Sequence, residues 1–436
     1  MITFDHSKKA FGLAVIFFLS LLIFSGCKKT NLHAETSKRL ASLSPPLRVS
    51  SVEMDAAEPA IATAPDGTFY VVWVNHGPKS QADVMIAHFS IEGQMEGPPV
   101  RVNNQPGTAT AWRGDPPTVA VAPDHTVLVG WTARVESESG HATDIYLSSS
   151  RDDGQTFGAA VKVNDDTKPA VHGMHSLAIG KDGRVYVAWL DERNLKPIAM
   201  KDMKMNDSSS GHHMESNREL FFASSTDGGH TFARNQRVAT NVCPCCKTAL
   251  AVASDGQLYV SWRQVLEGDL RHIAVSSSLD QGKTFSPAVI VSDDQWVLAG
   301  CPVSGSTLSV DNNGTLSVLW FSAGKSGETG LYWSQSKDHG ATFGSRRLVR
   351  TGLIKGTPVL LATSGGFAGV WEGIADGSAS VLSARLDTGA VSSDSLSIAS
   401  DGELPAAAAT RVGIVIAYLV KDDQHQGVWL VLERST

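Results

Sequence analysis

Three of the chain's five cysteines stand within four positions, in the stretch NVCPCCKT at residues 241–248. Thiols grouped in this way can pair as disulfides, bind a soft metal ion as thiolates, or act as nucleophiles beside a base. Cys243, Cys245, Cys246 and the more distant Cys301 make an even number, which favours disulfides in an exported domain. The stretch alone leaves a disulfide, a metal site and a reactive thiol as alternatives.

Registration against a repeated pattern predicts which residues lie around these cysteines. Cys243 precedes the turn glycine Gly256 by 13 residues, and Cys301 precedes the corresponding Gly314 by the same number. Equivalent positions of neighbouring repeats lie side by side, so we expect one cluster at the centre of the repeat array. Its predicted members, as metal ligands or disulfide partners, are Cys243, Cys245, Cys246, Cys301, His172 and His175.

A loop rich in methionine and histidine accompanies this cluster. The segment AMKDMKMNDSSSGHHMESNR, residues 199–218, holds the candidate ligands Met200, Met203, Met205, His212, His213 and Met214. Thioether, thiolate and imidazole groups together suit copper(I) better than zinc or calcium. Copper is therefore a candidate cofactor, while the alternative for the loop is an adaptable apolar flap.

Two repeats define the elements that must position these side chains. Four copies satisfy S-x-D-x-G-x-T-F, a pattern typical of a hairpin turn in which the Asp accepts backbone N–H bonds and Gly takes positive φ. Their structural Asp and Gly residues are Asp152, Gly154, Asp227, Gly229, Asp280, Gly282, Asp338 and Gly340. We expect the Phe of each copy to pack into the sheet.

The second repeat predicts an all-β propeller. An apolar strand, a turn and a strand ending in an aromatic residue recur at Trp73, Trp131, Trp189, Trp262, Trp320, Trp371 and Tyr418. Spacings of 58, 58, 73, 58, 51 and 47 residues indicate seven four-stranded blades, with six as the alternative. The last unit lacks a fourth strand, so we expect the segment near residues 47–53 to close the ring.

The S-x-D-x-G-x-T-F copies resemble the Asp-box, or bacterial neuraminidase repeat, and the exported chain resembles the sialidase-like superfamily. That resemblance implies a glycan ligand on the central face and, for an enzyme, an exo-sialidase type of glycoside hydrolase. Sialidases typically use an Arg-Ile-Pro motif and a tyrosine nucleophile. Here the corresponding place reads Ala57-Glu58-Pro59, and no tyrosine stands outside the repeated positions. Classical sialidase catalysis is therefore doubtful, and whether the chain is an enzyme stays open.

Several charged residues are weak catalytic candidates by their place at strand entries or loops, and turn caps or rim charges are the plainer interpretation of each. They are Glu58, Arg113, Asp115, Arg193, Arg218 and Arg263, with Asp191, Glu192 and Arg271 as further members. Three tryptophans outside the repeated position, Trp112, Trp296 and Trp333, are candidate sugar platforms. Three functions follow as alternatives: a glycan-binding or glycan-processing propeller, an exported copper-binding protein, or a non-catalytic assembly scaffold.

The N-terminus predicts export and a lipid anchor. Lys8 and Lys9 precede an apolar run at 13–24, and small residues lead to Cys27. This resembles a bacterial lipoprotein signal, which implies a signal peptide at 1–26, lipidation of Cys27, a tether at 27–44 and a propeller at 45–436. We expect the bacterial cell envelope, at the outer membrane and on its periplasmic or surface side. A formal charge of −7 without a basic block argues against nucleic acid, and we expect a monomer.

Overall fold

The computed structural model describes residues 39–435, except 41, 79–80, 139, 196–216, 299, 301, 387–394 and 423–424. The named elements are β-strands together with one 3₁₀ segment, η3 (Glu267–Asp269). Within the described residues, no helix is long and apolar enough to cross a membrane. The all-β architecture expected from the sequence is confirmed.

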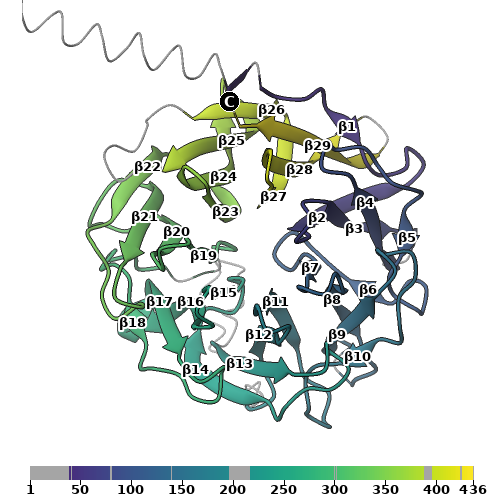
Figure 1. The fold of residues 1–436 in the computed structure, drawn as a ribbon. Helices are drawn as coiled ribbons and strands as arrows, with labels where there is room; N and C mark the ends of the chain where they lie inside the picture. The colour runs from purple at the N-terminus through teal and green to yellow at the C-terminus, as the bar shows by residue number, and fades with distance from the viewer. Residues whose placement is uncertain are drawn as a thin grey trace, which may run out of the picture.

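Strand pairing groups the described strands into six antiparallel sheets around a ring, one of which joins two successive units of the repeat, and the repeat units follow one another in chain order (Figure 1). The first three are β2 (Asp55–Thr63), β3 (Phe69–His76), β4 (Ala82–Phe89) and β5 (Val100–Arg101); β6 (Ala109–Thr110), β7 (Thr118–Val121), β8 (Val127–Arg134), β9 (Thr143–Ser150) and β10 (Val161–Lys162); and β11 (His172–Ile179), β12 (Val185–Asp191), β13 (Arg218–Ser225) and β14 (Gln236–Val242).

The next three units continue the order in the chain. They are β15 (Ala249–Val252), β16 (Leu258–Leu266), β17 (Leu270–Ser278) and β18 (Val289–Ile290); β19 (Ser306–Val310), β20 (Leu316–Ser322), β21 (Gly330–Ser336) and β22 (Arg347–Thr351); and β23 (Lys355–Thr363), β24 (Gly366–Ala375), β25 (Ser378–Leu386) and β26 (Leu396–Ser400). The third and fourth units share one hydrogen-bonded sheet through the single pair Val242–Gln264.

The seventh unit combines the two ends of the described chain. It comprises β27 (Gly402–Ala409), β28 (Gly413–Lys421), β29 (Gln426–Arg434) and β1 (Leu47–Arg48). Leu47 pairs with Leu430 and Arg48 with Trp429, so the N-terminal strand supplies the outer strand that β29 lacks. The closure expected from residues 47–53 is present, although the strand itself covers only two residues. Closing the ring in this way pairs an edge that would otherwise be exposed.

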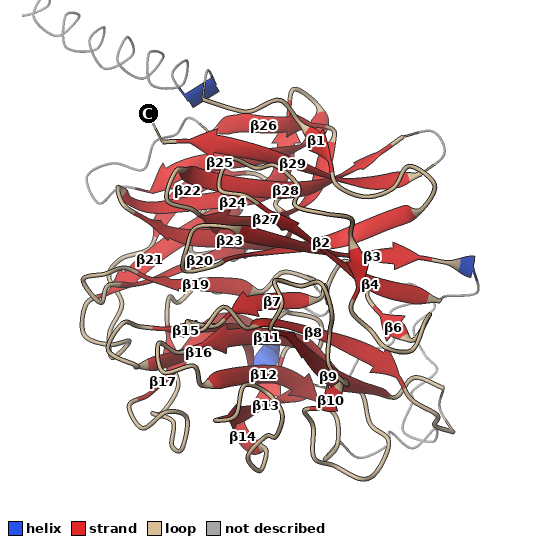
Figure 2. Cartoon of the chain, turned by 45° about the vertical axis from the view of Figure 1, so that its right-hand side comes forward, coloured by secondary structure: helices blue, strands red, loops and turns tan. Residues whose placement is uncertain are grey.

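Burial explains the repeated sequence pattern. The second strand of each unit lies between neighbouring sheets, which stack face to face around the ring (Figure 2), and it is apolar almost throughout. The repeated Trp73, Trp189 and Trp262 on these strands are at most 1% exposed. Innermost strands such as β7 and β15 are only partly buried along their length, because one of their faces lines the central channel.

The four S-x-D-x-G-x-T-F turns share one hydrogen-bond scheme. In the first copy, Asp152 Oδ1 accepts the backbone N–H of Thr156 at 2.9 Å, Asp152 Oδ2 accepts the Thr156 hydroxyl at 2.6 Å, and Ser150 Oγ accepts the N–H of Gly154 at 3.0 Å. The glycine takes φ of 80° in this copy and 83° to 88° in the others. Phe157 packs on the core beneath the turn, as the sequence predicted.

Candidate functional site

A channel follows the ring axis, and all seven innermost strands line it. Its volume is about 320 Å³, and residues such as Ile61, Val119, Leu250, Leu308 and Val359 form its wall. At one end the channel opens into a small polar mouth of about 60 Å³ where the innermost strands begin. The mouth is lined by Glu58, Pro59, Arg113, Gly114, Pro116, Lys247, Lys355, Gly356, Thr357, Leu404 and Pro405.

Equivalent positions of the repeat build this mouth. Glu58 and Lys247 each stand nine residues before the turn glycine of their own unit, Gly67 and Gly256. Glu58 and Leu404 both have φ of 50°, and the pairing of their strands is shifted at the same point. Left-handed backbone in such bulky residues is strained and concentrates at functional sites. The bulges turn these residues from the strand toward the mouth.

Lys247, a cation at the mouth, forms no salt bridge within the described residues, although Asp115 lies close enough to attract its charge. Its Nζ donates to the carbonyl oxygen of Pro116 at 3.2 Å, and its side chain is partly exposed. Burial lowers the pKa of Lys247 to about 8, against the attraction of Asp115. The ammonium group is therefore charged at neutral pH and available to an anion. Sequence reasoning missed this residue, although its nine-residue offset from Gly256 was visible.

The other cations at the mouth share buried carboxylates. Arg113 donates to Glu372, which is 1% exposed, and lies 3.3 Å from Glu403. Lys355 Nζ lies 3.5 Å from the second oxygen of Glu372. Arg113 is thus at the mouth, as predicted, but two carboxylates from distant blades already hold it. Neither Lys355 nor Glu372 was a candidate from the sequence.

Glu58 forms an acid–imidazole pair at the mouth. Its Oε2 lies 2.6 Å from Nε2 of His76, and the Glu58 side chain is 8% exposed. The hydrogen bond to Glu58 raises the pKa of His76 above its ordinary value, against partial burial. This is the place where the sialidase resemblance implied an arginine, and it presents a negative group.

Of the three candidate aromatic platforms, one is exposed. Trp112 is 45% exposed, and its ring covers the mouth residue Gly114, whose added Cβ would lie 2.4 Å from Trp112. Trp296 and Trp333 are 7% and 1% exposed, and both belong to the core beside β20 and β24. The prediction for those two was wrong, because they fill gaps between neighbouring blades where the repeated pattern has other residues.

The tyrosines are packing residues. Tyr70, Tyr186 and Tyr259 are at most 1% exposed. Burial raises the pKa of Tyr259 and Tyr418 to about 12, and it raises the pKa of the other four tyrosines as well. A tyrosine nucleophile needs its ionised form to be favoured, and these environments favour the neutral phenol.

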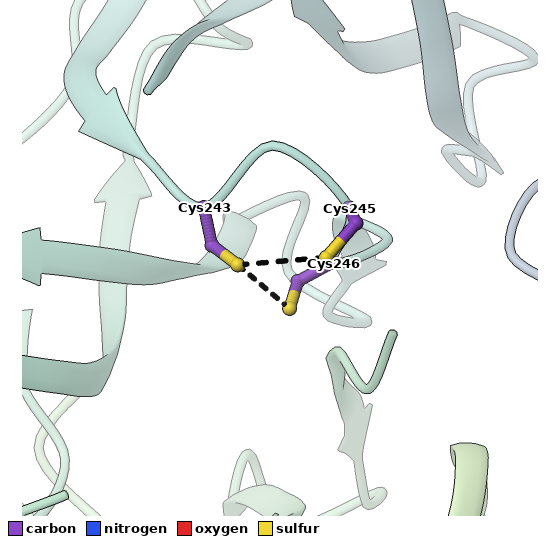
Figure 3. Close-up of side chains that lie close together, drawn as sticks. All are labelled: Cys243, Cys245 and Cys246. Carbon is purple, nitrogen blue, oxygen red and sulfur yellow. Dashed lines mark hydrogen bonds between the residues drawn. The ribbon is translucent and has the colours of Figure 1, made fainter. Parts of the chain in front are cut away.

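The cysteine stretch lies in the turn between β14 and β15 (Figure 3). Cys245 is disulfide-bonded, whereas Cys243 and Cys246 are free and buried. The Cys243 Sγ lies 3.1 Å from the Cys246 Sγ and 4.0 Å from the Cys245 Sγ. In this structure Cys243 is free, so neither disulfide that the sequence left open for it is formed, and its thiol lies beside the free thiol of Cys246.

Three of the candidate arginines are held away from the mouth. Arg263 is fully buried and donates to the carbonyl oxygens of Ser304 and Phe321, so it cannot meet a ligand on the surface. Arg193 pairs with Asp165 and Asp191 beside the third blade. Arg218 pairs with Glu192 and donates to the carbonyl oxygen of Pro244 at 2.6 Å.

The two histidines do not join the cysteines. His172 is fully buried, its Nδ1 lies 2.5 Å from the carbonyl oxygen of Thr143, and its Nε2 lies 3.2 Å from Asp166. Burial opposes its charged form, but Asp166 and Asp191 outweigh burial and raise the pKa of His172. Its contacts within the described residues include Thr143, Asp166 and Asp191, and the three cysteines are not among them.

The second histidine has an acidic partner of its own. His175 Nδ1 lies 3.2 Å from Asp115, and this pair holds the pKa of Asp115 below its usual range despite burial. Within the described residues, two separate groups could accommodate a metal ion, namely the three cysteines and Asp144, Asp166 and His172. His172 therefore belongs to a different group from the cysteines with which it was expected to cluster.

Some predicted residues lie outside the described residues. They are Cys27, Cys301, Met200, Met203, Met205, His212, His213 and Met214.

The fold and the axial mouth define the class of this protein as a β-propeller. No known protein family matches the sequence. No curated protein matches it either.

Solved structures give the particular likenesses. A protein of unknown function from Dyadobacter fermentans is 12% identical with a TM-score of 0.52, over 90% of this chain and all of that one. An ulvan lyase, a polysaccharide lyase bound to the saccharide GlcA(1-4)Rha3S, is 12% identical with a TM-score of 0.53, over 89% and 96%. The Hadza microbial sialidase Hz136 is 13% identical with a TM-score of 0.46, over 87% and 66%. Likeness at this identity extends to the fold alone.

Proposed function

We propose that the propeller binds an acidic saccharide at its axial mouth. The observation that carries the proposal is Lys247, an ammonium group at the mouth that forms no salt bridge within the described residues and donates to the carbonyl oxygen of Pro116. A buried or half-buried cation is stabilised by an anion, and a uronate carboxylate fits a recess of this size. The exposed ring of Trp112 beside the mouth offers an apolar face for a sugar ring.

The saccharide class follows from the charge at the mouth. Arg113 pairs with Glu372 and Glu403, and Lys355 pairs with Glu372. The rim around Lys247 therefore carries both positive and negative groups that are already paired. The ulvan lyase with the same fold is bound to a saccharide that contains glucuronate. That likeness is of fold, so the proposal for this chain rests on its own mouth residues.

Binding measured by calorimetry tests this proposal. A uronate-bearing oligosaccharide should bind at pH 7, and its carboxyl-reduced neutral counterpart should bind at least tenfold more weakly. Lys247→Met should remove the difference between the two sugars, whereas Lys421→Met, at an exposed position that pairs with Glu403, should keep it. Equal binding of both sugars by the unmodified chain would contradict the proposal.

Processing of the glycan is a separate question. The buried tyrosines give no support to exo-sialidase chemistry, and we expect no release of a fluorogenic sialoside. The readout is fluorescence over time with the full chain, and a release that depends on Glu58 would reverse this expectation.

A second proposal is that the cysteine stretch binds a soft metal, copper(I) above all. It is supported by the sulfur atoms of Cys243, Cys245 and Cys246, which all lie within 4.8 Å of one another. Binding by three thiolates requires that the disulfide at Cys245 be reduced first. Copper analysis of anaerobically purified protein tests it. If neither sugar nor metal binds, the results favour the third alternative, a non-catalytic assembly scaffold.

We also propose that Cys27 carries a lipid that anchors the propeller to the bacterial envelope. The support is the sequence alone, with its basic residues, apolar run and small residues before the cysteine. Fractionation of cells that produce the chain and its Cys27→Ala variant tests the anchor. The unmodified chain should partition with membranes and the variant should not.

A further inference from the structure

We propose that Cys243 and Cys246 form a reversible dithiol–disulfide couple, which exchanges two electrons with a small-molecule or protein disulfide. The two residues have Cys-x-x-Cys spacing, and their sulfur atoms are 3.1 Å apart in the turn between β14 and β15. This inference concerns the core beside the mouth and does not rest on the saccharide proposal.

The sulfur distance allows a disulfide between Cys243 and Cys246. Two thiolates on one tetrahedral metal, each bonded at about 2.3 Å, place their sulfur atoms about 3.8 Å apart. A disulfide needs about 2.05 Å. Cys243 and Cys246 are 3.1 Å apart, closer than metal-bound sulfurs and within a short side-chain movement of a bond. Cys245 is already bonded elsewhere, which leaves these two thiols to each other.

The positive charge of a buried guanidinium, that of Arg263, favours a negative charge on the cysteine pair. Arg263 is fully buried, it donates to the carbonyl oxygens of Ser304 and Phe321, its guanidinium lies 4.8 Å from the centre of the Trp296 ring, and its Nη1 has no hydrogen-bond partner in the described residues. A buried cation without a counter-ion is strongly unfavourable. The charge of Arg263 acts on the Cys243 thiol and favours its thiolate, which can serve as that counter-ion.

The proton distribution within the pair follows from its contacts. The hydrogen bond from Cys246, together with the charges of Arg263 and Arg271 and the N–H of Cys245, lowers the pKa of Cys243 to about 6, against burial. Burial and the charge on Cys243 raise the pKa of Cys246. The 3.1 Å between the two sulfur atoms allows either thiol to attack first, and the contacts of Cys243 favour it as the attacking thiol and Cys246 as the resolving one.

The exchange balances in two steps. The Cys243 thiolate attacks one sulfur of an external disulfide R–S–S–R, forming a mixed disulfide and releasing one R–S⁻. Cys246 gives its proton to that thiolate and attacks the Cys243 sulfur, forming the intramolecular S–S bond and releasing the second R–S⁻. The chain gives up two electrons, and the external disulfide becomes one thiol and one thiolate.

Arg263 also shifts the equilibrium between the reduced dithiol and the disulfide toward the reduced form. Its charge stabilises the thiolate of the reduced pair and loses its counter-ion when the disulfide forms. Removing that charge should therefore favour oxidation. Arg346 offers a matched control, because it is an arginine of the next blade that binds the buried Asp294 and lies away from the cysteines.

The experiment equilibrates the full chain, purified without oxygen, with set ratios of glutathione and glutathione disulfide. Acid quenching and alkylation then count free thiols by mass. The count should fall by two as the buffer becomes oxidising and recover when it becomes reducing, and both changes should vanish in Cys243→Ser and Cys246→Ser. In Arg263→Gln the equilibrium constant for oxidation should rise about tenfold, while Arg346→Gln leaves it unchanged.

Three results would overturn the proposal. One is a thiol count in the unmodified chain that stays constant across all ratios. Another is an Arg263→Gln constant equal to that of the Arg346→Gln control. The third is stoichiometric copper on the purified chain that protects both thiols from oxidation, which would assign the pair to a metal site instead.

Discussion

Arg218 on β13 holds the cysteine turn, because its Nη1 donates to the carbonyl oxygen of Pro244 at 2.6 Å. The same guanidinium pairs with Glu192 at 2.6 Å and is only 12% exposed. One side chain therefore bridges the loop after β12 and the residue between Cys243 and Cys245. Opening of this turn is the step that would expose the buried thiols.

Weakening that bridge should make the thiols accessible. In Arg218→Gln, native-state alkylation of Cys243 and Cys246 should proceed several-fold faster, because local opening governs access to buried groups. The readout is the alkylated mass against time without denaturant. Arg237→Gln, which removes an exposed guanidinium from the buried Glu219 in the same blade, serves as the control and should keep the original rate. Equal rates in both variants would show that Arg218 does not hold the turn.

Lys247 predicts a rise of stability in alkaline solution. Its pKa is about 8 in the folded chain against an ordinary 10.5, so the unfolded chain binds more protons between those pH values. The free energy of unfolding should therefore rise across this window by about 2 kcal/mol or less from this group. Denaturant unfolding at pH 7.5 and pH 10, compared with Lys247→Met, isolates the contribution. The free energy of unfolding of the unmodified chain minus that of Lys247→Met should rise as the pH rises.

Trp112 predicts a loss of sugar binding without a loss of stability. In Trp112→Ala, the dissociation constant for the uronate-bearing oligosaccharide should rise about fivefold, since a ring contact contributes about 1 kcal/mol. Because Trp112 is 45% exposed, the melting temperature should change little. Leu279→Ala, at an 83% exposed residue, is the matched control for removal of exposed apolar surface. An unchanged dissociation constant in Trp112→Ala would remove the tryptophan from the site.

Three glycines with similar backbone angles should differ in their tolerance of alanine. Gly183, Gly154 and Gly229 have φ of 76°, 80° and 88°. An added Cβ would meet nothing within 4 Å at Gly183, Tyr70 at 3.4 Å from Gly154, and Leu147 at 2.4 Å from Gly229. Backbone strain of about 1 kcal/mol applies to all three, and overpacking adds about 1–3 kcal/mol at Gly229 alone. Thermal unfolding of the three alanine variants should rank Gly229→Ala as the least stable.

For His172 we expect a contribution to the free energy of unfolding that falls as the pH rises, opposite to that of Lys247. Its pKa is raised in the folded chain, so the stabilisation is fully present below its ordinary pKa of 6.5 and is lost as the pH rises through the folded value. The groups that face the ring are Thr143 and Asp144 from β9, Asp166 from the loop after β10, and Asp191 from β12. His172→Gln should therefore destabilise more at pH 5.5 than at pH 9 in denaturant unfolding. The reverse order would contradict the assigned protonation.

The repeats of the sequence predicted the fold because their information is local. Each Asp turn satisfies its own bonds within five residues, as between Asp152 and Thr156, and each repeated tryptophan marks a strand buried on both faces. The ring closure was also predictable, since the last unit visibly lacked a strand. These features need no knowledge of distant contacts.

The site was predicted only in part, because it depends on contacts between blades. Arg113 was a candidate, but Glu372, which binds it, lies 259 residues away and carries no local signal. Registration placed Cys243 and His172 at one end of the ring, whereas side-chain direction separated them. Lys247 was not a candidate from the sequence, because a single lysine next to a cysteine stretch carries no signal of its own. Its position in the repeat nevertheless matches that of Glu58.

Ring closure by β1 has a mechanical consequence. Leu47 and Arg48 pair with β29, and Arg39 and Arg385 both reach the buried Glu433, at 2.8 Å and 3.2 Å. A force that pulls the chain from its N-terminal side would break these bonds one after another. It would not stretch all of them at the same time. If the propeller is tethered through Cys27, the tether enters at this seam, and the grip of Arg39 on Glu433 is the first bond to bear tension.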